Sequence, residues 1–455
     1  MSTKEDHTVS LKVRLAQGVA QHRLWNKDHQ ELHDAARNGQ KPSMIIYHNG
    51  AVDPAALLNL PPGTAFCVGA FPLILRDPDE IGDCASIYPF LAAASYATQN
   101  LGVEKHVMVI TSNGPLSAYM RGEHQMGPLM APWMDVWGSV VKEAEAFAAQ
   151  VGMNDDVEEK NRIIALALLG RNAKILEEVV GKKVTRCYLD MESGVLEVHS
   201  HGDLAEMWRS SSEKRIGNLD LYKGPLQALA CSCCDSRAGH GHLYCAQPGE
   251  FLDANVIAAI VPPYKDIVAN KIPHPVWALT EHAHSLGVRE AVVTGHSQCG
   301  GIKALVDWKA SGQSPGKYLD AWVGQAAGVV DEVFDYARKE GFLTDDKGNI
   351  SDKVYRLTEM RVTQWSARNL EEYFKDRANE LGETYEDGKI LAHYLKIEER
   401  EVYVLDLHAG IEETFKGMQS LETLQSSAQL LDAEGAPRLP NGQRQKAKRM
   451  IRGLA

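Results

Sequence analysis

Two short motifs, each placed where a β-strand should end, constrain the fold of this chain more than any other feature. Residues 230–237 read Ala-Cys-Ser-Cys-Cys-Asp-Ser-Arg and overlap the end of an apolar segment at 226–231. Residues 295–303 read Gly-His-Ser-Gln-Cys-Gly-Gly-Ile-Lys and follow a second strand-like segment at 290–294. The ends of parallel strands lie at one edge of a sheet, where open α/β sheets bind ligands. The pattern therefore predicts an α/β fold in which the two motifs meet.

The side chains in these motifs form a metal-binding set. Because Cys and His are the usual ligands of zinc, Cys233, His296 and Cys299 are the candidate ligands. A fourth position is then left for Asp235, water or substrate. Cys233 and Asp235 face the same way in an extended backbone, whereas alternation puts Cys234 on the opposite face. The alternative interpretation, buried thiols and a core histidine, suits a lone Cys better than this combination.

The motifs and their order resemble those of the β-class carbonic anhydrases. Cys-x-Asp-x-Arg at 233–237 is followed by His-x-x-Cys at 296–299. Residues 247–250 (Gln-Pro-Gly-Glu) and 260–264 (Ile-Val-Pro-Pro-Tyr) also match the family. The resemblance implies a twisted, mostly parallel sheet flanked by helices, and a dimer with the active site at its interface. It also implies Zn²⁺ as the cofactor, bound by the three ligands named above.

An activity follows from the same resemblance, the reversible hydration of carbon dioxide to bicarbonate by a zinc-bound hydroxide. Asp235 would accept a hydrogen bond from that hydroxide, or bind zinc as a conditional fourth ligand. Arg237 would hold Asp235 through a bidentate pair. Gln247 and Gly300 are predicted to bind substrate, the first through its amide and the second by allowing close backbone approach. Each also has a plain structural interpretation, as a loop residue before proline and as helix-start packing.

Three places depart from the family pattern. Asn255 and Val256 stand where the family usually carries Arg-Asn, Ala259 where it carries Asn, and Glu281 where it carries Tyr. These changes put the substrate or the rate in doubt, but not the metal.

Two other functions are therefore kept open. The first is a zinc hydrolase of carbonyl sulfide or carbon disulfide, motivated by the changed pocket positions. The second is a non-catalytic, zinc-stabilised scaffold or bicarbonate-binding subunit. The Asp235–Arg237 pair argues against the second function, because a purely structural zinc needs no such pair.

The first half of the chain repeats features of the second. Aligning Pro62 with Pro248 gives an offset of 186 (248 − 62 = 186), which places Tyr47 at the position of Cys233. Further along, Leu101-Gly102-Val103 and Leu286-Gly287-Val288 repeat at an offset of 185 (286 − 101 = 185), which places Thr111 at the position of His296. Self-similarity of this length predicts a duplicated domain. The alternative is an unrelated α/β domain that shares the same order of strands, turns and helices by chance.

The predicted architecture is two fused copies of one fold, a β-carbonic-anhydrase-like pseudo-dimer whose degenerate first copy lacks the metal ligands. That copy would supply interface and one wall of the pocket. The family resemblance further implies a homo-oligomer of this unit. The predicted boundaries are 1–200 for the first copy with an N-terminal helix at 9–38, 201–219 for a linker or helix, 220–421 for the zinc-bearing copy and 422–455 for a polar tail.

Charge, hydropathy and cysteine content limit which partners and which cellular compartment we expect. The formal net charge is −12, so a nucleic-acid partner has no electrostatic support. No apolar run is long enough to span a membrane, and the polar start does not read as a secretion signal. Most of the 8 cysteines gather around the two motifs, which suits a reducing compartment and a metal better than disulfides. We predict a cytoplasmic protein acting on a small molecule, and leave an organelle or microcompartment open.

Overall fold

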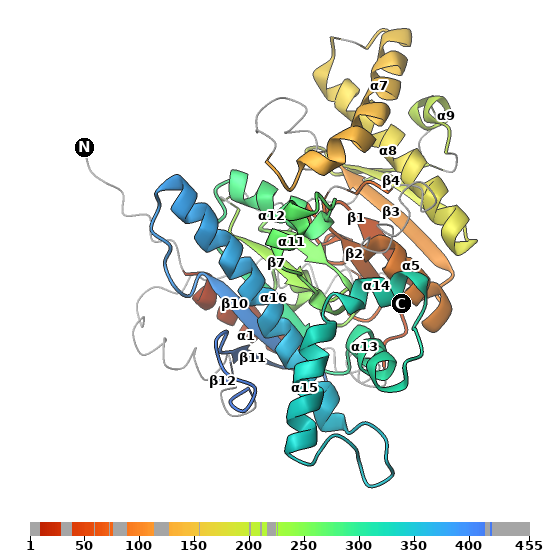
Figure 1. Cartoon of the computed structure of the whole chain (residues 1–455). Helices are drawn as coiled ribbons and strands as arrows, with labels where there is room; N and C mark the ends of the chain where they lie inside the picture. Colours follow the sequence, from red (N-terminus) through yellow and green to blue (C-terminus); the bar gives the residue numbers. More distant parts are fainter. Residues whose placement is uncertain are drawn as a thin grey trace.

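The strands of the chain form one mixed, mostly parallel sheet within an α/β fold (Figure 1). The order across the sheet is β12-β11-β10-β9-β7-β8-β2-β1-β3-β4-β5-β6. The α/β prediction is therefore confirmed. This architecture comes from a computed structural model that describes residues 10–28, 39–58, 60–71, 73–75, 89–112, 127–153, 155–199, 202–209, 212–215, 224, 226–414 and 419–420.

In the first half, β1 lies between β2 and β3 and is parallel to both. β4 continues the sheet parallel to β3, and then β5 and β6 add antiparallel neighbours. β1, β2 and β4 are almost wholly buried, as expected for strands inside a covered parallel sheet. The bounds are Met44–His48 (β1), Ala65–Gly69 (β2), Lys105–Thr111 (β3), Val184–Asp190 (β4), Val195–His199 (β5) and Ser212–Arg215 (β6).

The second half has the same arrangement. β7 lies between β8 and β9 and is parallel to both, β10 is parallel to β9, and β11 and β12 follow as antiparallel strands. Every residue of β7, β8 and β9 is buried. The bounds are Ala228–Ser232 (β7), Phe251–Asn255 (β8), Ala291–His296 (β9), Ile390–Lys396 (β10), Glu401–Leu405 (β11) and Gln419–Ser420 (β12).

The two halves meet where β2 pairs antiparallel with β8, through Gly69 opposite Asn255. This pair joins the last residue of each strand, so the seam lies at corresponding places in both halves. Such a contact between like elements is the geometry of a self-complementary, two-fold interface.

Pairing registers show which residues correspond between the halves. Each central strand ends on a residue that pairs with both neighbouring strands: His48 with Gly69 and Val109, and Ser232 with Asn255 and Thr294. Matching these residues gives an offset of 184 for β1 and β7 (232 − 48 = 184), not the 186 expected from the prolines. The register therefore places Asn49, and not Tyr47, at the position of Cys233. It keeps Thr111 at the position of His296.

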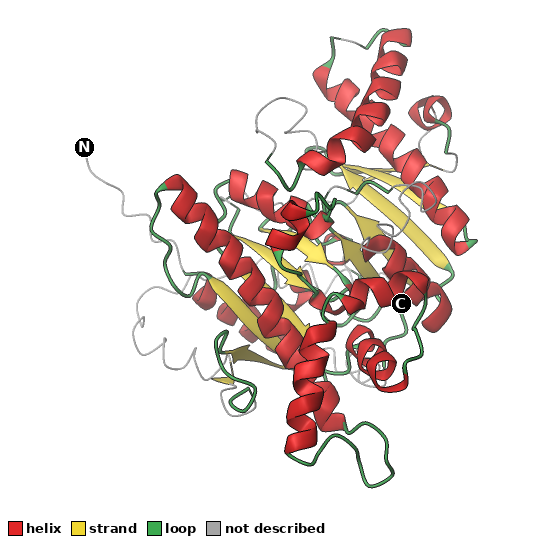
Figure 2. Cartoon of the chain, viewed as in Figure 1, coloured by secondary structure: helices red, strands yellow, loops and turns green. Residues whose placement is uncertain are grey.

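Alternate strand residues pack on opposite faces of the sheet, and helices cover both faces (Figure 2). One face carries a large hydrophobic cluster that runs through both halves, beneath α5, α8, α12, α13 and α16. The other face carries two separate clusters, one in each half. Helices that contribute residues to these clusters include α1 (Leu11–Asp28), α5 (Pro89–Asn100), α8 (Val157–Val180), α10 (His240–Leu243), α12 (Pro275–Ser285), α13 (Gly300–Ser311) and α16 (Asp352–Leu381).

The remaining helices are short or lie at the rim. They are α3 (Pro54–Leu57), α7 (Met134–Gln150), α9 (Leu204–Arg209), α11 (Tyr264–Ala269), α14 (Lys317–Gly324) and α15 (Ala327–Lys339), with 3₁₀ turns at Ala131–Trp133 (η2) and Ile257–Ala259 (η3). Capping sets several helix ends. Asp156 accepts a hydrogen bond from the N–H of Glu159 at the start of α8, and Gly181 ends that helix in the left-handed conformation.

Some predicted segments differ from what the structure contains. The N-terminal helix expected at 9–38 is α1, and residues 29–38 lie outside the described part of the chain. Although α1 was expected to belong with the first copy, Leu11, Leu15 and Val19 pack in the hydrophobic cluster of the second half. The expected linker at 201–219 contains α9 and β6, and β6 pairs with β5 in the first half. The tail at 422–455 lies outside the described residues.

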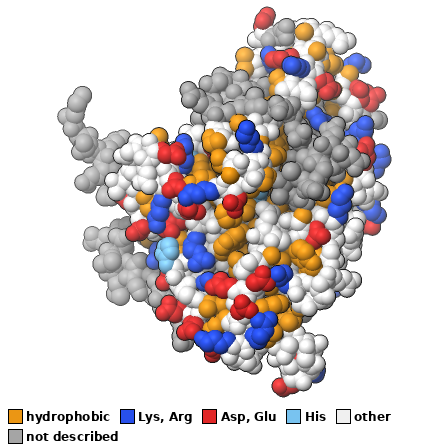
Figure 3. All heavy atoms as spheres, in the orientation of Figure 1, with side chains coloured by type: hydrophobic (Ala, Val, Ile, Leu, Met, Phe, Trp, Pro, Cys, Tyr) orange, Lys and Arg blue, Asp and Glu red, His pale blue; other side chains and the backbone are white. Residues whose placement is uncertain are grey.

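Surface charge and helix hydropathy bear on the expected partners. Lys, Arg, Asp and Glu side chains are interspersed on the face shown in Figure 3, so neither sign dominates there. Within the described residues, no helix is long and apolar enough to cross a membrane.

Candidate active site

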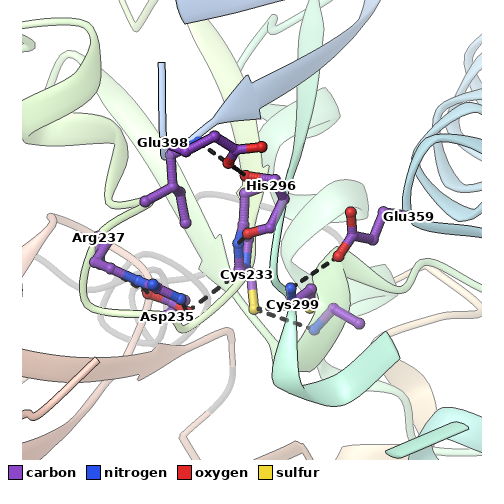
Figure 4. Close-up of polar contacts among 10 residues, drawn as sticks. Cys233, Asp235, Arg237, His296, Cys299, Glu359 and Glu398 are labelled. Carbon is purple, nitrogen blue, oxygen red and sulfur yellow. Dashed lines mark hydrogen bonds and ion pairs between the residues drawn. The ribbon is translucent and has the colours of Figure 1, made fainter. Parts of the chain in front are cut away.

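Three buried side chains from the two motifs converge at one edge of the second half (Figure 4). Cys233 directly follows β7, His296 is the last residue of β9, and Cys299 is the N-cap of α13. Their donor atoms all lie within 4.8 Å of one another. The meeting expected from the strand ends is thus present in the structure, because β7 and β9 are adjacent and parallel.

The imidazole of His296 is oriented for metal binding. Its Nδ1 lies 2.9 Å from the carbonyl oxygen of Ser297, which defines Nδ1–H as the donor. Its Nε2 is buried without a hydrogen-bond partner among the described residues. A buried ring nitrogen left unbonded beside two thiols fits a zinc ligand, so the residues present fit the metal.

Electrostatics also favour a cation at this point. Burial opposes ionisation of Cys233, but hydrogen bonds from the Cys234 and Cys299 thiols and the charge of His296 hold its pKa well below the ordinary value. Burial likewise lowers the pKa of His296, but the charges of Cys233 and Asp235 outweigh it and raise that pKa to about 9. The negative charges of Cys233 and Asp235, which raise this pKa, would equally favour a bound cation.

A strained loop next to the cluster points an N–H group at Cys233. Ala258 and Ala259 both have positive φ, 58° and 52°, which is unusual for residues other than glycine. The backbone N–H of Ala258 donates to Cys233 Sγ at 3.3 Å. Trp322 Nε1 donates to the carbonyl of Ile257 at 3.0 Å and so ties down the other side of the loop. Backbone strain of this kind is concentrated at functional sites, and no sequence pattern predicted it here.

Asp235 and Arg237 form the expected pair. Arg237 donates from Nε to Asp235 Oδ1 at 2.8 Å and from Nη2 to Oδ2 at 2.7 Å, and its backbone N–H reaches Oδ1 at 3.0 Å. The side chains are 1% and 4% exposed, so solvent barely screens the pair. Asp235 Oδ2 also lies 3.9 Å from His296 Nε2. The carboxylate therefore rests on Arg237 while facing the ligand group.

A small cavity of about 40 Å³ lies beside Arg237. It is large enough for a few water molecules. Both halves line it, together with α1; the lining residues are His22, Pro62, Ser236, Arg237, Gly239, His242, Leu243, Leu395, Ile397 and Arg400. The Gly63 N–H also donates to the Ser236 carbonyl at 2.8 Å, so a first-half loop holds the segment between Asp235 and Arg237.

Tyr96, from α5 of the first half, reaches the ligand group across the seam. A Cβ built on Gly300 would lie 1.9 Å from the Tyr96 hydroxyl oxygen, so only glycine leaves room for it. Burial, followed by the charges of Cys299 and Asp235, raises the pKa of Tyr96, which keeps the hydroxyl protonated as a donor. The sequence reasoning missed Tyr96. At the offset of 185, Tyr96 corresponds to Glu281, the position where the family has Tyr, and this match was the available signal.

Two carboxylates support the loop between His296 and Cys299. Glu359 of α16 accepts the backbone N–H of Cys299 at 2.9 Å. Ser297 Oγ donates to Glu398 Oε2 at 2.5 Å and accepts the N–H of Ile397 at 2.8 Å. Burial raises the pKa of Glu359 to about 7. Neither glutamate lies in a motif, so the sequence reasoning missed both.

Two of the departures from the family pattern make contacts between the halves. Asn255 Oδ1 lies 2.9 Å from His48 Nε2, at the seam between β2 and β8. Glu281 accepts the N–H groups of Met130 at 2.8 Å and Leu129 at 3.4 Å, in a first-half loop. These contacts direct Asn255 and Glu281 toward the first half.

Gln247 and Cys234 differ in their relation to the cluster. Gln247 is exposed, in a turn closed by its own N–H bond to Glu250 Oε2, and the structure does not bring it to the buried ligands. Its role in substrate binding stays a prediction. Cys234 was expected on the opposite face from Cys233, but both residues pack in the same hydrophobic cluster. The expectation was wrong because β7 ends at Ser232, so strand alternation no longer applies.

The first half holds a hydrogen bond where the second half holds ligands. Asn49 and Thr111 occupy the positions of Cys233 and His296, and Asn49 Nδ2 donates to Thr111 Oγ1 at 3.2 Å. Both residues are buried. This pair satisfies its own polar groups and offers neither thiolate nor imidazole to a metal.

Comparisons with known proteins point to one family for the second half. The family model described as carbonic anhydrase matches residues 228–379, which include the three ligand-type residues. β carbonic anhydrase 5, chloroplastic, of Arabidopsis thaliana is 34% identical over 115 residues, 24% of this chain and 36% of that protein. The match thus spans about a third of that relative's length.

Solved structures give distant similarities. The tetrameric β-carbonic anhydrases of Sordaria macrospora match with 21% identity and a TM-score of 0.30, covering 40% of this chain and 82% of theirs. The β-carbonic anhydrase CafA of Aspergillus fumigatus matches with 17% identity and a TM-score of 0.31, covering 42% of this chain and 92% of its own.

Proposed function

Residues 228–379 form a β-class carbonic anhydrase domain, and from this premise we propose that the chain catalyses the reversible, zinc-dependent hydration of carbon dioxide to bicarbonate. The observation that carries the proposal is the buried group of Cys233, His296 and Cys299, with all donor atoms within 4.8 Å of one another. Two thiolates and one imidazole are a donor set that catalytic zinc sites use, with the fourth position open.

When bound, zinc would lower the pKa of a coordinated water from about 15.7 towards about 7, which supplies hydroxide near neutral pH. The residues of the chain would orient that chemistry. Asp235 would accept a hydrogen bond from the attacking water. That bond would orient a lone pair of the water oxygen toward carbon dioxide. Arg237, with its two N–H groups on Asp235, would hold the carboxylate there. If Arg237 released it, Asp235 would take the fourth position and close the site to water.

We also infer that the chain is two fused copies of one fold, the first without ligands. Identical strand order and pairing in the two halves support this inference. The first copy would serve as one wall of the site, because Tyr96, Pro62 and Gly63 lie beside Gly300, Arg237 and Ser236. Assembly of such chains into a homo-oligomer stays a prediction from the family resemblance.

Carbon dioxide is favoured over carbonyl sulfide and carbon disulfide as the substrate. The sulfur alternatives were motivated by changed positions that were expected near the pocket. Two of them, Asn255 and Glu281, instead spend their polar atoms on hydrogen bonds within the protein, Asn255 with His48 and Ser232 and Glu281 with the first-half loop that holds Met130. Substrate binding by Gly300 stays a prediction, with its backbone beside the Tyr96 hydroxyl.

The test is carbon dioxide hydration by stopped flow, on protein of measured zinc content, from about pH 6.5 to about pH 9, which brackets the pKa of a zinc-coordinated water. Cys299→Ser serves as the blank. Fast hydration that scales with zinc content is the expected result. A zinc-loaded protein with no rate above the blank would overturn the proposal. Sulfide release from carbonyl sulfide, faster than carbon dioxide hydration, would support the sulfur alternative.

A further inference from the structure

We propose that Glu359 is a positioning residue for the zinc ligand Cys299, a role that rests on the proposed zinc site. Glu359 lies in α16 and is 4% exposed. Its Oε1 accepts the backbone N–H of Cys299 at 2.9 Å, and its Oε2 accepts the hydroxyl of Tyr394 at 2.6 Å. Both carboxylate oxygens are thus bonded, one to the ligand loop and one to β10. The bond to Cys299 is drawn in Figure 4.

The ligand loop needs support from outside itself. Gln298, between His296 and Cys299, has a φ of +59°, a left-handed conformation that side chains other than glycine rarely adopt. Such backbone persists only when the surroundings over-determine it. Cys299 is the N-cap of α13, so its N–H lies before the first helical hydrogen bond and requires an external acceptor.

The loop is held at both ends by elements that follow it in the chain. At its start, Ser297 bonds Glu398 and the N–H of Ile397, at the turn after β10. At its end, Glu359 holds Cys299. Tyr394, the second partner of Glu359, lies in β10 opposite Gly295 of β9. The bridge from Cys299 through Glu359 to Tyr394 therefore links one ligand to β10, the strand next to β9, which carries the ligand His296.

This bridge sets the spacing of the ligands. Without an acceptor at Glu359, Cys299 would be free to turn its N–H elsewhere, and its Sγ would leave the position that completes the group. Outer-shell partners of metal ligands typically change metal affinity by about 10–100-fold. Because the carboxylate acts through the Cys299 backbone, its loss should weaken zinc binding without unfolding the domain.

The test compares zinc retention in four variants of the full chain. Glu359→Leu removes both acceptors, Glu359→Asp keeps the charge but shortens its reach, and Glu359→Gln keeps one acceptor oxygen for Cys299. Glu371→Leu is the matched control, because Glu371 is also a buried glutamate of α16 but pairs with Lys375 and His408. The measurements are the rate of zinc transfer to a chelator, the thiolate charge-transfer band of the Co²⁺-substituted protein, and the melting temperature.

We expect Glu359→Leu and Glu359→Asp to lose zinc about 10–100 times faster than wild type and to shift the Co²⁺ band. Glu359→Gln should recover most of the difference, and Glu371→Leu should retain zinc as wild type does. Wild-type retention and an unshifted band in Glu359→Asp would overturn the role, whether or not Glu359→Leu folds. Zinc binding is measured apart from hydration, so a wild type that holds zinc but lacks activity would refute only the proposed function. A wild type that takes up no zinc would refute both.

Discussion

The two halves of the molecule have the same sheet but different chemistry at the same strand ends. In the second half, Cys233 and His296 stand at the ends of β7 and β9 with a third ligand nearby. In the first half, Asn49 and Thr111 stand at the corresponding places and bond each other at 3.2 Å. The same sheet therefore surrounds a hydrogen-bonded Asn–Thr pair in one half and a candidate zinc site in the other.

In each half, one side chain contacts the other half, and the two contacts differ in what they reach. Tyr96 of the first half reaches Gly300 beside the ligands. Glu281, at the corresponding position of the second half, accepts backbone N–H groups of Leu129 and Met130. One contact adds a hydroxyl to the candidate site, while the other holds a loop in place. Corresponding positions of the two halves therefore have different surroundings, one beside the candidate site and one in a structural contact.

The largest expected effect comes from matched changes at the two strand ends. His296→Ala should abolish zinc binding and reduce carbon dioxide hydration to the background rate, because a ligand is lost. Thr111→Ala should leave zinc content and rate unchanged, at a cost of about 1 kcal/mol in stability for its lost hydrogen bond. Zinc per chain and stopped-flow hydration check both. A loss of zinc in Thr111→Ala would contradict the assignment of the site to the second half alone.

The next effect concerns the seam, where Asp253 of β8 corresponds to Cys67 of β2. Burial raises the pKa of Asp253 from 3.8 to about 6, against the opposing bond from His240. Because the folded state favours the protonated carboxyl of Asp253, its contribution to the unfolding free energy is fully present below about pH 3.8. That contribution is lost as the pH rises through about 6 and the buried carboxyl ionises. The shift corresponds to about 3 kcal/mol. Relative to Asp253→Asn, the wild type should therefore lose about that much unfolding free energy across this window.

Urea unfolding of both proteins at several pH values between about 4 and 7 measures this difference. Cys67→Ala is the control, since the pKa of Cys67 lies well above its ordinary value and does not titrate in this range. A difference between wild type and Asp253→Asn that does not change with pH would refute the assignment.

A smaller effect is expected at Glu281. Glu281→Leu leaves the buried N–H groups of Leu129 and Met130 without an acceptor, which should cost about 2 kcal/mol of unfolding free energy. Hydration per bound zinc should not change. Thermal unfolding and zinc-normalised rates check this pair of outcomes. A fall in rate with unchanged stability would mean that Glu281 belongs to the site after all.

The smallest effect is expected at Tyr96. Tyr96→Phe removes one hydroxyl beside Gly300 and keeps the ring packing against Phe66. Loss of one hydrogen bond of about 1 kcal/mol should lower kcat/KM about fivefold, with zinc content unchanged. Rates at matched zinc loading test this. An unchanged kcat/KM in Tyr96→Phe would mean that the first half supports the site only structurally.

The ligand group was predictable because its residue types are chemically unusual and stand next to strand ends. Cys233 and His296 lie at the ends of two strand-like segments, Cys299 follows His296 closely, and parallel strands bring such ends together. Asp235 and Arg237, two residues apart, also meet as expected. The match between Tyr47 and Cys233 failed, because sequence offsets do not reveal that the loop after β1 and the loop after β7 differ by two residues.

By itself, the sequence determined the α/β class, the three candidate ligands and the adjacent Asp–Arg pair, since these depend on segment pattern and residue type. Only the tertiary structure decided that Tyr96 crosses the seam, that Glu359 holds Cys299, that Asp235 rests on Arg237 and that Asn49 faces Thr111. The contacts of Tyr96 and Glu359 join residues far apart in the chain through the packing of whole helices against the sheet. No local periodicity encodes such packing, because it depends on how every element between the two residues is placed.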